Sequence, residues 1–303
     1  MSNVKKILKI VISLLLAGIV VTVLAAGAVY WQSSDRLAQK YTVVVKPAPV
    51  HPVDAAALAR GRHLAETRGC VECHGADYGG AKVVDDPAMG RLHGPNLTRG
   101  HGGLPADFTD ADWERAIRHG VARDGRGLFL MPSTDYARFT TQDMSDLIAH
   151  LKSVPPVNRD RVPLSVGPVA RTLLLAGKIK LAADEIDHKT LAPSDVVPGV
   201  TVAYGQYLAA SCTGCHGATL AGGRIDIGPP DWPPASNLTP HASGRLAKWS
   251  EADFMKTLRT SRRPDGSELN PVMPRVFANL TDVETRALWA YLQTLPPLAT
   301  GSR

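Results

Sequence analysis

The chain begins with the longest apolar stretch in its sequence. Residues 10–30 form a run of 21 positions without a charged side chain, and three lysines are the only charged residues before it. As a helix this run would be about 31 Å long, which matches the roughly 30 Å hydrocarbon core of a bilayer. Because lysines precede the run, the positive-inside rule predicts a cytoplasmic tail at 1–9, a transmembrane anchor at 10–31 and an outward-facing remainder.

A cleavable signal peptide is the alternative interpretation of the same segment. Ala26-Gly27-Ala28 offers small residues of the kind that a signal peptidase accepts. The apolar cores of signal peptides usually run only about 7–15 residues, so the longer run favours a retained anchor. Both interpretations place everything after Trp31 outside the cytoplasm.

The rest of the chain shows amphipathic helices separated by long loops. Apolar residues recur at helical spacing in Leu58–Ala65 and in Leu288–Leu292. Thr109, Ser250 and Thr281 each stand three residues before an acid, as N-cap residues often do. No convincing alternating strand pattern lies between these segments, so the predicted fold class is all-α.

The same series of segments occurs twice, at an offset of 141 to 144 residues. The matched pairs are Gly61–Ala65 with Gly205–Ala209, Cys70–Gly75 with Cys212–Gly217, Asn96–Thr98 with Asn237–Thr239, Met131-Pro132 with Met273-Pro274, and Pro155-Pro156 with Pro296-Pro297. A repeat in this order predicts two copies of one domain, at 52–156 and 200–298, joined by a connector at 157–199. The connector contains an apolar helical stretch at 169–186, which predicts a segment packed between the domains.

Composition adds two expectations about what the protein binds. Aromatic residues make up only 6% of the chain, which is sparse for filling two cores and predicts that a cofactor occupies part of the interior. The net charge of +6 predicts docking to acidic surfaces of a protein or of lipid headgroups. No lysine-rich block or nucleic-acid motif is present, so nucleic acid is not an expected partner.

Two cysteine clusters carry the chemistry. All four cysteines fall into Cys-x-x-Cys-His motifs, the attachment signature of c-type haem. One helical turn with this spacing presents two sulfurs to the vinyl groups of one porphyrin, and the histidine projects toward the iron. The sequence therefore predicts two covalently bound haem c groups. The expected attachment residues are Cys70, Cys73, Cys212 and Cys215, and the expected proximal iron ligands are His74 and His216.

A zinc site built from both cysteine pairs, or two redox dithiols, would be the alternative. Zinc ribbons usually separate their cysteine pairs by about 20 residues, whereas Cys212 follows Cys73 by 139 positions. Each pair also has its own histidine directly after it. Both features favour haem.

A methionine stands at the same distance after each of these histidines. Met131 follows His74 by 57 positions, and Met273 follows His216 by 57. Each methionine precedes a proline, which stops a helix and holds the thioether in a rigid loop. Most methionines fill cores, but the matched spacing predicts that Met131 and Met273 are the distal iron ligands. The competing histidines have no counterpart in the other copy; they are His93, His101, His119, His150 and His241.

Iron held between a histidine and a methionine has no open coordination position. Such a centre exchanges electrons, and we expect neither a catalytic residue nor a small-molecule substrate at the haems. Methionine ligation also raises the reduction potential relative to bis-histidine ligation. A dihaem peroxidase, the enzymatic alternative, would need one displaceable distal ligand, which the duplicated methionine disfavours.

The ordered motifs resemble the multihaem cytochrome c subunits of membrane-bound periplasmic dehydrogenases that oxidise alcohols, gluconate and related compounds. The likeness covers about 52–298. It rests on Gly-x-x-Leu before Cys-x-x-Cys-His-Gly, on Asn-Leu-Thr, on a helix with Asp-Trp or Asp-Phe followed by Arg118 or Arg259, and on Met-Pro. Those subunits commonly carry three haems and a carboxyl-terminal anchor, whereas this chain has two motifs and an amino-terminal anchor candidate.

The amino-terminal run predicts domains on the periplasmic side of a bacterial inner membrane, held by one membrane-spanning helix. The resemblance implies a fold of two tandem class I cytochrome c domains. It also implies electron transfer between a periplasmic or membrane dehydrogenase and the respiratory chain. The alternative partner is a terminal oxidase or a quinol-oxidising supercomplex.

Overall fold

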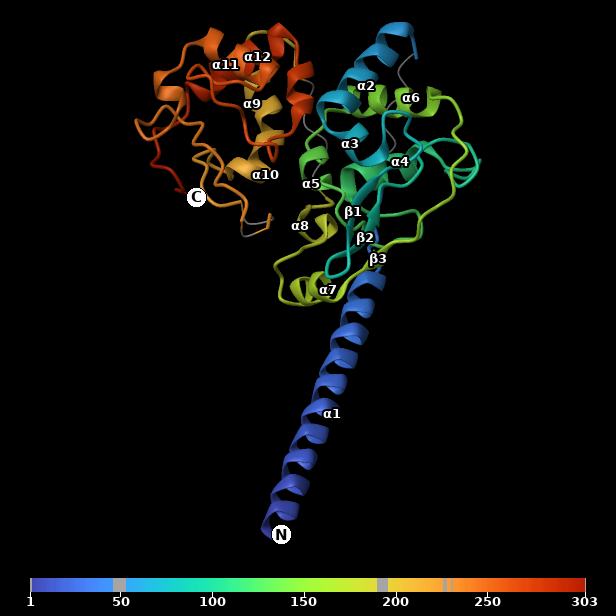
Figure 1. The fold of residues 1–303 in the computed structure, drawn as a ribbon. Coiled ribbons are helices and arrows are strands. Elements are labelled where there is room, and N and C mark those ends of the chain that lie inside the picture. Colours follow the sequence, from blue (N-terminus) through green and yellow to red (C-terminus); the bar gives the residue numbers. More distant parts are fainter. Residues whose placement is uncertain (1, 46–52, 190–195, 226–227, 230, 303) are drawn as a thin grey trace.

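A long amino-terminal helix carries two helical domains that lie side by side at one of its ends (Figure 1). The computed structural model describes residues 2–45, 53–189, 196–225, 228–229 and 231–302. Helix α1 (Ser2–Ala38) contains the apolar run and continues about two turns beyond Trp31. In the described part of the chain it is the one helix long and apolar enough to cross a membrane. Its apolar side chains are exposed along the run.

The two domains are built from corresponding helices. The first contains α2 (Ala55–Thr67), α3 (Cys70–His74), β1 (Lys82–Asp86), β2 (Gly90–His93), α4 (Asp110–His119), α5 (Ser133–Tyr136) and α6 (Thr141–Ser153). The connector contains β3 (Ser165–Val166), α7 (Pro168–Leu175) and α8 (Ala182–Glu185). The second domain contains α9 (Val202–Ala209), η1 (Ala210–Cys212), α10 (Thr213–His216), η2 (Leu246–Lys248), α11 (Glu251–Thr260), η3 (Arg275–Asn279) and α12 (Asp282–Leu292). The predicted all-α class, with two tandem domains after one long apolar helix, is confirmed.

One close helix crossing fixes the frame of each domain. Helix α2 crosses α6 at Gly61, where an added Cβ would lie 2.0 Å from the carbonyl oxygen of Asp146. Helix α9 crosses α12 at Gly205, where an added Cβ would lie 1.9 Å from the carbonyl oxygen of Ala287. Real side chains do not approach a backbone oxygen so closely, so only glycine lets these helices touch. The matched glycines of the sequence repeat are therefore contact points of the fold.

The cores on either side of these crossings use matched positions. The first core includes Leu64, Trp113 and Leu147, and the second includes Leu208, Phe254 and Leu288, all of them buried.

The predicted helix starts are also confirmed. Thr109, Ser250 and Thr281 begin α4, α11 and α12, and each forms a reciprocal capping box with the acid three residues later.

A small sheet in the first domain was not expected. Strands β1 and β2 form an antiparallel hairpin, and β3 of the connector pairs with β2 in the order β1-β2-β3. Strand β1 has no buried residue, so its sequence lacks the alternation that marks a half-buried strand. The hairpin turn is held instead by Asp86, whose carboxylate accepts hydrogen bonds from the backbone N–H groups of Ala88 and Met89 at 2.9 and 2.7 Å.

The connector is more broken than its apolar pattern suggested. The stretch at 169–186 contains two short helices, α7 and α8, separated by a turn in which Gly177 has φ of 66°. Helix α7 packs on α1, and α8 packs on α5. The residues after α8 reach the domain boundary, where Ile186 and Asp187 line one cavity with Thr213 and Gly214 of the second domain. Among its described residues, the connector thus reaches the boundary between the domains at α8 and the residues directly after it.

Candidate haem centres

The Cys-x-x-Cys-His motifs form single helical turns. Helix α3 is the whole first motif, and η1 with α10 carries the second. Burial raises the pKa of the Cys70 thiol to about 12 and that of Cys212 to about 11. Redox-active dithiols depend on a lowered thiol pKa, so thiols whose pKa is raised do not fit the dithiol alternative.

The motif histidines are oriented by backbone carbonyls. His74 Nδ1 lies 2.9 Å from the carbonyl oxygen of Pro95, and His216 Nδ1 lies 2.7 Å from that of Ser236. In the tautomer that donates this hydrogen bond, Nε2 has a free lone pair for a metal. Burial lowers the pKa of both imidazoles, which favours the neutral form that a metal requires.

The Asn-Leu-Thr turns hold these carbonyls in place. In the first domain, Asn96 accepts hydrogen bonds from the backbone N–H and hydroxyl of Thr98 at 2.9 and 2.8 Å and donates to the Val157 carbonyl at 2.7 Å. In the second, Asn237 accepts the same pair from Thr239, both at 2.8 Å, and donates to the carbonyl of Leu298 at 2.8 Å. From the sequence, these asparagines were recognisable only as a recurring Asn-Leu-Thr segment. The hydrogen bonds show that they tie the turn to the segment after the closing helix, and Asn237 also lines the cavity described next.

The second domain contains a cavity of about 410 Å³ at its attachment turn. This volume lies within the range of about 300–1,000 Å³ usual for cofactor sites. The predicted site residues of this domain come together in its wall: Cys212, Cys215, His216 and Met273 all line it. Most of the remaining lining is apolar, including Leu246, Trp249, Phe254, Phe277 and Leu288.

Two polar atoms in this cavity wall are buried and lack a partner. Thr257 Oγ1 and Arg263 Nε have no hydrogen-bond partner among the described residues, and both side chains line the cavity together with Arg245. Burial, reinforced by the nearby Arg245, lowers the pKa of Arg263. Unsatisfied buried donors and two cations suit an anionic group, and haem carries two propionates. The donor set of this cavity therefore fits haem c.

Two of the predicted site residues of the first domain lie against one core. Cys70 and Met131 are both half-buried and pack against the same buried cluster. The segment after Met131 is held by Arg118, which donates to the carbonyl oxygens of Ala137 and Phe139 at 2.9 and 2.8 Å. Its counterpart Arg259 instead pairs with Asp282 at the start of α12. The two arginines of the shared motif thus fix different parts of their domains.

Four of the competing histidines are engaged with other side chains. His150 Nε2 lies 3.0 Å from the hydroxyl of Tyr78, His119 pairs with His188 at 3.1 Å, His101 with Asp160 at 3.0 Å, and His241 with Ser243 at 2.8 Å. The fifth, His93, ends strand β2. These contacts agree with the structural or surface role expected for them.

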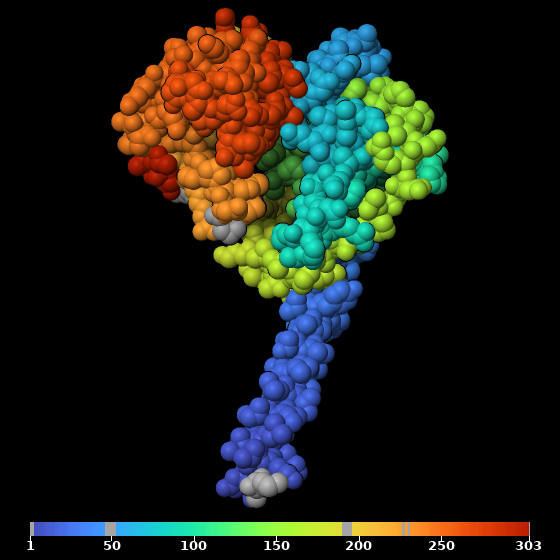
Figure 2. Space-filling view, in the orientation of Figure 1, coloured from blue at the N-terminus to red at the C-terminus, as the bar shows by residue number. Residues whose placement is uncertain are grey.

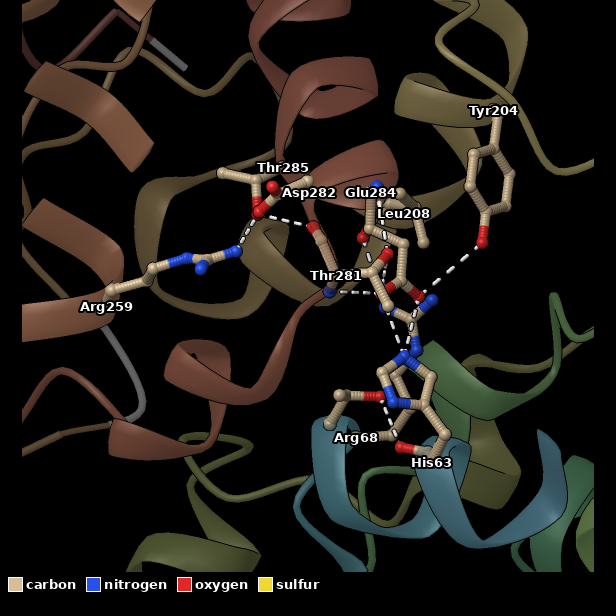
Figure 3. Close-up of polar contacts among 10 residues, drawn as sticks. His63, Arg68, Tyr204, Leu208, Arg259, Thr281, Asp282, Glu284 and Thr285 are labelled. Atoms are coloured by element: carbon tan, nitrogen blue, oxygen red, sulfur yellow. Dashed lines mark hydrogen bonds and ion pairs between the residues drawn. The ribbon is translucent and has the colours of Figure 1, made fainter. Parts of the chain in front are cut away.

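The junction between the domains is polar and centred on Arg68 (Figure 3). This arginine precedes the first motif by two residues and is buried. It donates to Ser211 Oγ at 2.7 Å and to the Leu208 carbonyl at 3.3 Å, just before the second motif. Beside it, His63 Nε2 lies 2.8 Å from a carboxylate oxygen of Glu284. His63 and Tyr207 occupy matched positions of the repeat, but contacts between the two copies leave no local pattern in the sequence, so this junction was not predicted.

Two helical domains, each with a Cys-x-x-Cys-His turn and an oriented histidine, define a protein with covalent haem-binding domains. Comparison with known proteins agrees: the cytochrome c family matches residues 58–155 and 202–296. The chain belongs to the cytochrome c family, which binds haem c covalently.

Curated relatives cover most of the chain. It is 27% identical over 86% of its length to the fructose dehydrogenase cytochrome subunit of Gluconobacter japonicus. It is 29% identical over 81% of its length to the cytochrome c subunit of the quinone alcohol dehydrogenase of Gluconacetobacter polyoxogenes. In both comparisons the chain spans only 57% of the relative. A protein named as a dihaem c-type cytochrome, from Cereibacter sphaeroides, is 28% identical over 79% of this chain and 86% of that relative.

Proposed function

We propose that this protein is a membrane-anchored dihaem cytochrome c that transfers electrons between a dehydrogenase and the respiratory chain. The observation that carries the proposal is the duplicated site. Each copy combines a Cys-x-x-Cys-His turn, a histidine held by a backbone carbonyl and a methionine at the same later position. In this role the protein carries electrons and performs no bond chemistry of its own.

Each domain would hold one haem c with its own residues. The ligand set is Cys70, Cys73, His74 and Met131 in the first domain and Cys212, Cys215, His216 and Met273 in the second. The bound haem supplies a reversible one-electron couple. His74 and His216 would each bind the iron through an imidazole held in one tautomer, Met131 and Met273 would each supply a sulfur ligand, and apolar side chains would surround the group in the second domain. Together these residues would exclude water and reactants from the iron and raise its reduction potential.

The junction supports transfer in series through the two domains. Arg68 and Ser211 bring the chain segments before the two attachment turns into direct contact. A second contact joins the hydroxyl of Tyr207 to the carboxylate of Asp143. Several such hydrogen bonds hold the domains in one arrangement, so the separation between the two centres stays constant and one can accept electrons while the other donates.

The partner follows from the relatives and from charge. The relatives named above are cytochrome subunits of a fructose and an alcohol dehydrogenase, and a gluconate 2-dehydrogenase subunit of Pantoea cypripedii is 29% identical over 79% of this chain. A net charge of +6 suits an acidic docking face on such a dehydrogenase, with association weakening as salt rises.

The location follows from α1. Its apolar run is long enough to span a bilayer, and the lysines before it favour a cytoplasmic amino terminus. Thioether attachment of haem occurs outside the cytoplasm, so both domains would lie on the periplasmic side of a bacterial inner membrane, held by a single pass.

Co-purification from native membranes tests the function. Detergent-solubilised protein carrying an affinity tag should elute with a dehydrogenase, and ethanol, fructose or gluconate added to the complex should reduce its haems. Membranes that contain an active terminal oxidase should then reoxidise them. Elution with a terminal oxidase and no dehydrogenase would contradict the proposal and favour the oxidase alternative. Rapid turnover of peroxide by the reduced protein would contradict the carrier role.

A further inference from the structure

Helix α7 of the connector is apolar on its exposed side as well as on its buried side. Ala170 and Leu174 are buried, as expected of a helix that packs on its neighbours. However, Val169 and Leu175 expose 45% and 37% of their surfaces. A surface helix of a water-soluble domain normally turns polar residues outward. A helix with apolar side chains on both sides therefore indicates a second apolar environment that would cover its exposed side.

This helix is fixed to α1 where α1 leaves the predicted hydrocarbon core. Arg171 Nη1 donates to Ser33 Oγ at 2.8 Å and Ser34 Oγ at 3.0 Å. Its guanidinium also lies 4.2 Å from the centre of the Tyr30 ring. Tyr30 and Trp31 are exposed aromatic residues of the kind that concentrates at membrane interfaces. Tyr30 to Ser34 spans only about 6 Å along the helix, so α7 lies beside the end of the predicted membrane-spanning segment.

A second set of contacts joins the connector to the chain near the end of α1. Arg36 of α1 pairs with Asp184 of α8, and the hydroxyl of Tyr41 donates to the same carboxylate at 2.7 Å. The connector is thus attached to the anchor at both of its helices. Figures 1 and 2 show the yellow-green connector at the base of the two domains, beside the point where α1 emerges.

An exposed apolar side chain and an exposed cation flank α7 in the sequence. Leu164, directly before β3, exposes half of its surface, and Lys178, three residues after the end of α7, is exposed. Apolar side chains beside a cation are the pattern of segments that lie in the boundary between headgroups and acyl chains, where anionic lipids attract the cation.

We propose that α7 and its flanking residues rest in the headgroup region of the bilayer that α1 spans, in contact with anionic phospholipid. This inference rests on the anchor of the proposed function. With α1 it provides a second point of membrane contact, which fixes the tilt of the first domain and the height of both haem centres above the lipid.

The test uses the full-length holoprotein in vesicles of phosphatidylcholine and phosphatidylglycerol. Haem attachment consumes all four native cysteines, so one introduced cysteine takes a spin label specifically. The variants are Leu175→Cys on α7 and Val283→Cys on α12, an exposed apolar position of the second domain. Each variant must show the unaltered haem absorption spectrum.

At position 175 the label should be shielded from a water-soluble nickel relaxant and accessible to oxygen, whereas at position 283 it should be fully accessible to nickel. The shielding at position 175 should weaken in vesicles of phosphatidylcholine alone. Equal nickel access at both positions, in protein that stays with the vesicles after an alkaline wash, would overturn the inference and leave the anchor intact. Release by the wash would overturn the anchor and, with it, this inference.

Discussion

At the scale of single residues, the orientation of each Cys-x-x-Cys-His histidine depends on a hydrogen bond to a backbone carbonyl outside the motif. His216 is held by the carbonyl of Ser236, and Asn237 fixes that carbonyl by bonding to both sides of its turn. The sequence showed that Asn96 and Asn237 recur in the same context, but hydrogen-bond partners about 60 residues away, at Val157 and Leu298, cannot be deduced from a local pattern.

Asn237→Ala tests this arrangement. The variant removes the hydrogen bonds that Asn237 makes to Thr239 and to the Leu298 carbonyl, so the free energy of unfolding should fall by about 1–3 kcal/mol. The imidazole of His216 should lose part of its orientation, and one of the two haem potentials should shift. Chemical denaturation and a spectroelectrochemical titration measure the two effects. Asn279→Ala, at an exposed position, is the control. Unchanged potentials and stability in Asn237→Ala would contradict the role of the turn.

At the scale of elements, the glycine contacts decide whether the helices can cross. Gly205→Ala should destabilise the second domain by about 1–3 kcal/mol, because the methyl group would meet the Ala287 carbonyl. Gly214→Ala is the matched control, since nothing lies within 4 Å of its added Cβ and alanine favours the helix. Thermal unfolding of the holoprotein compares them. Equal melting temperatures for the two variants would contradict a close crossing at Gly205.

The helices could be predicted and the small sheet could not, for a physical reason. Helices α4, α11 and α12 begin at capping boxes and bury one face, and both signals are local in the sequence. The hairpin of β1 and β2 is mostly exposed, and its third strand comes from the connector about 70 residues later. Its stability depends on pairing between distant segments, which leaves no periodic trace. The break in the connector at Gly177 was likewise hidden within a stretch whose apolar residues favour a helix on both sides of it.

At the scale of the whole molecule, the domain junction should depend on pH. The hydrogen bond to Glu284 raises the pKa of His63. Burial alone would raise the pKa of Glu284, but the hydrogen bonds from His63 and Thr281 outweigh it and lower that pKa. The stabilisation of the folded protein by His63 is fully present below the pKa of about 6.5 that His63 has in the unfolded chain. This stabilisation is lost as pH rises through the higher pKa of His63 in the folded protein. The stabilisation of the folded protein by Glu284 is present above its unfolded-state pKa of about 4.3. This stabilisation is lost as pH falls through the lower pKa of Glu284 in the folded protein.

The pair should therefore stabilise the junction most between about pH 4.5 and 6.5, by about 1 kcal/mol. Melting temperatures of the holoprotein should fall as pH rises from this window to about 8, and the fall should be smaller in His63→Gln. His101→Gln removes an exposed pair with Asp160 and serves as the control. The same pH dependence in His63→Gln and in the unaltered protein would contradict this role.

Arg68 should couple the two domains. Arg68→Ala removes the bonds to Ser211 and Leu208 and leaves a buried gap, so the junction should weaken by about 2 kcal/mol. Calorimetry should then resolve two unfolding transitions that lie closer together or coincide in the unaltered protein. Arg62→Ala, on the exposed face of the same helix, is the control. A single unchanged transition in Arg68→Ala would show that other contacts hold the domains together.

The central claim is that a histidine and a methionine bind each of two irons, which leaves no position for a reactant. The most direct measurement is the weak long-wavelength absorption of oxidised iron bound by methionine sulfur, recorded with the reduction potentials of Met131→Ala, Met273→Ala and the control Met255→Ala. We predict that Met131→Ala and Met273→Ala each lose the long-wavelength absorption of one of the two haems and lower the reduction potential of that haem. Met255→Ala should retain the absorption and the potentials of both haems. Full absorption in Met131→Ala or Met273→Ala, or a water-bound iron in the unaltered protein, would contradict the account.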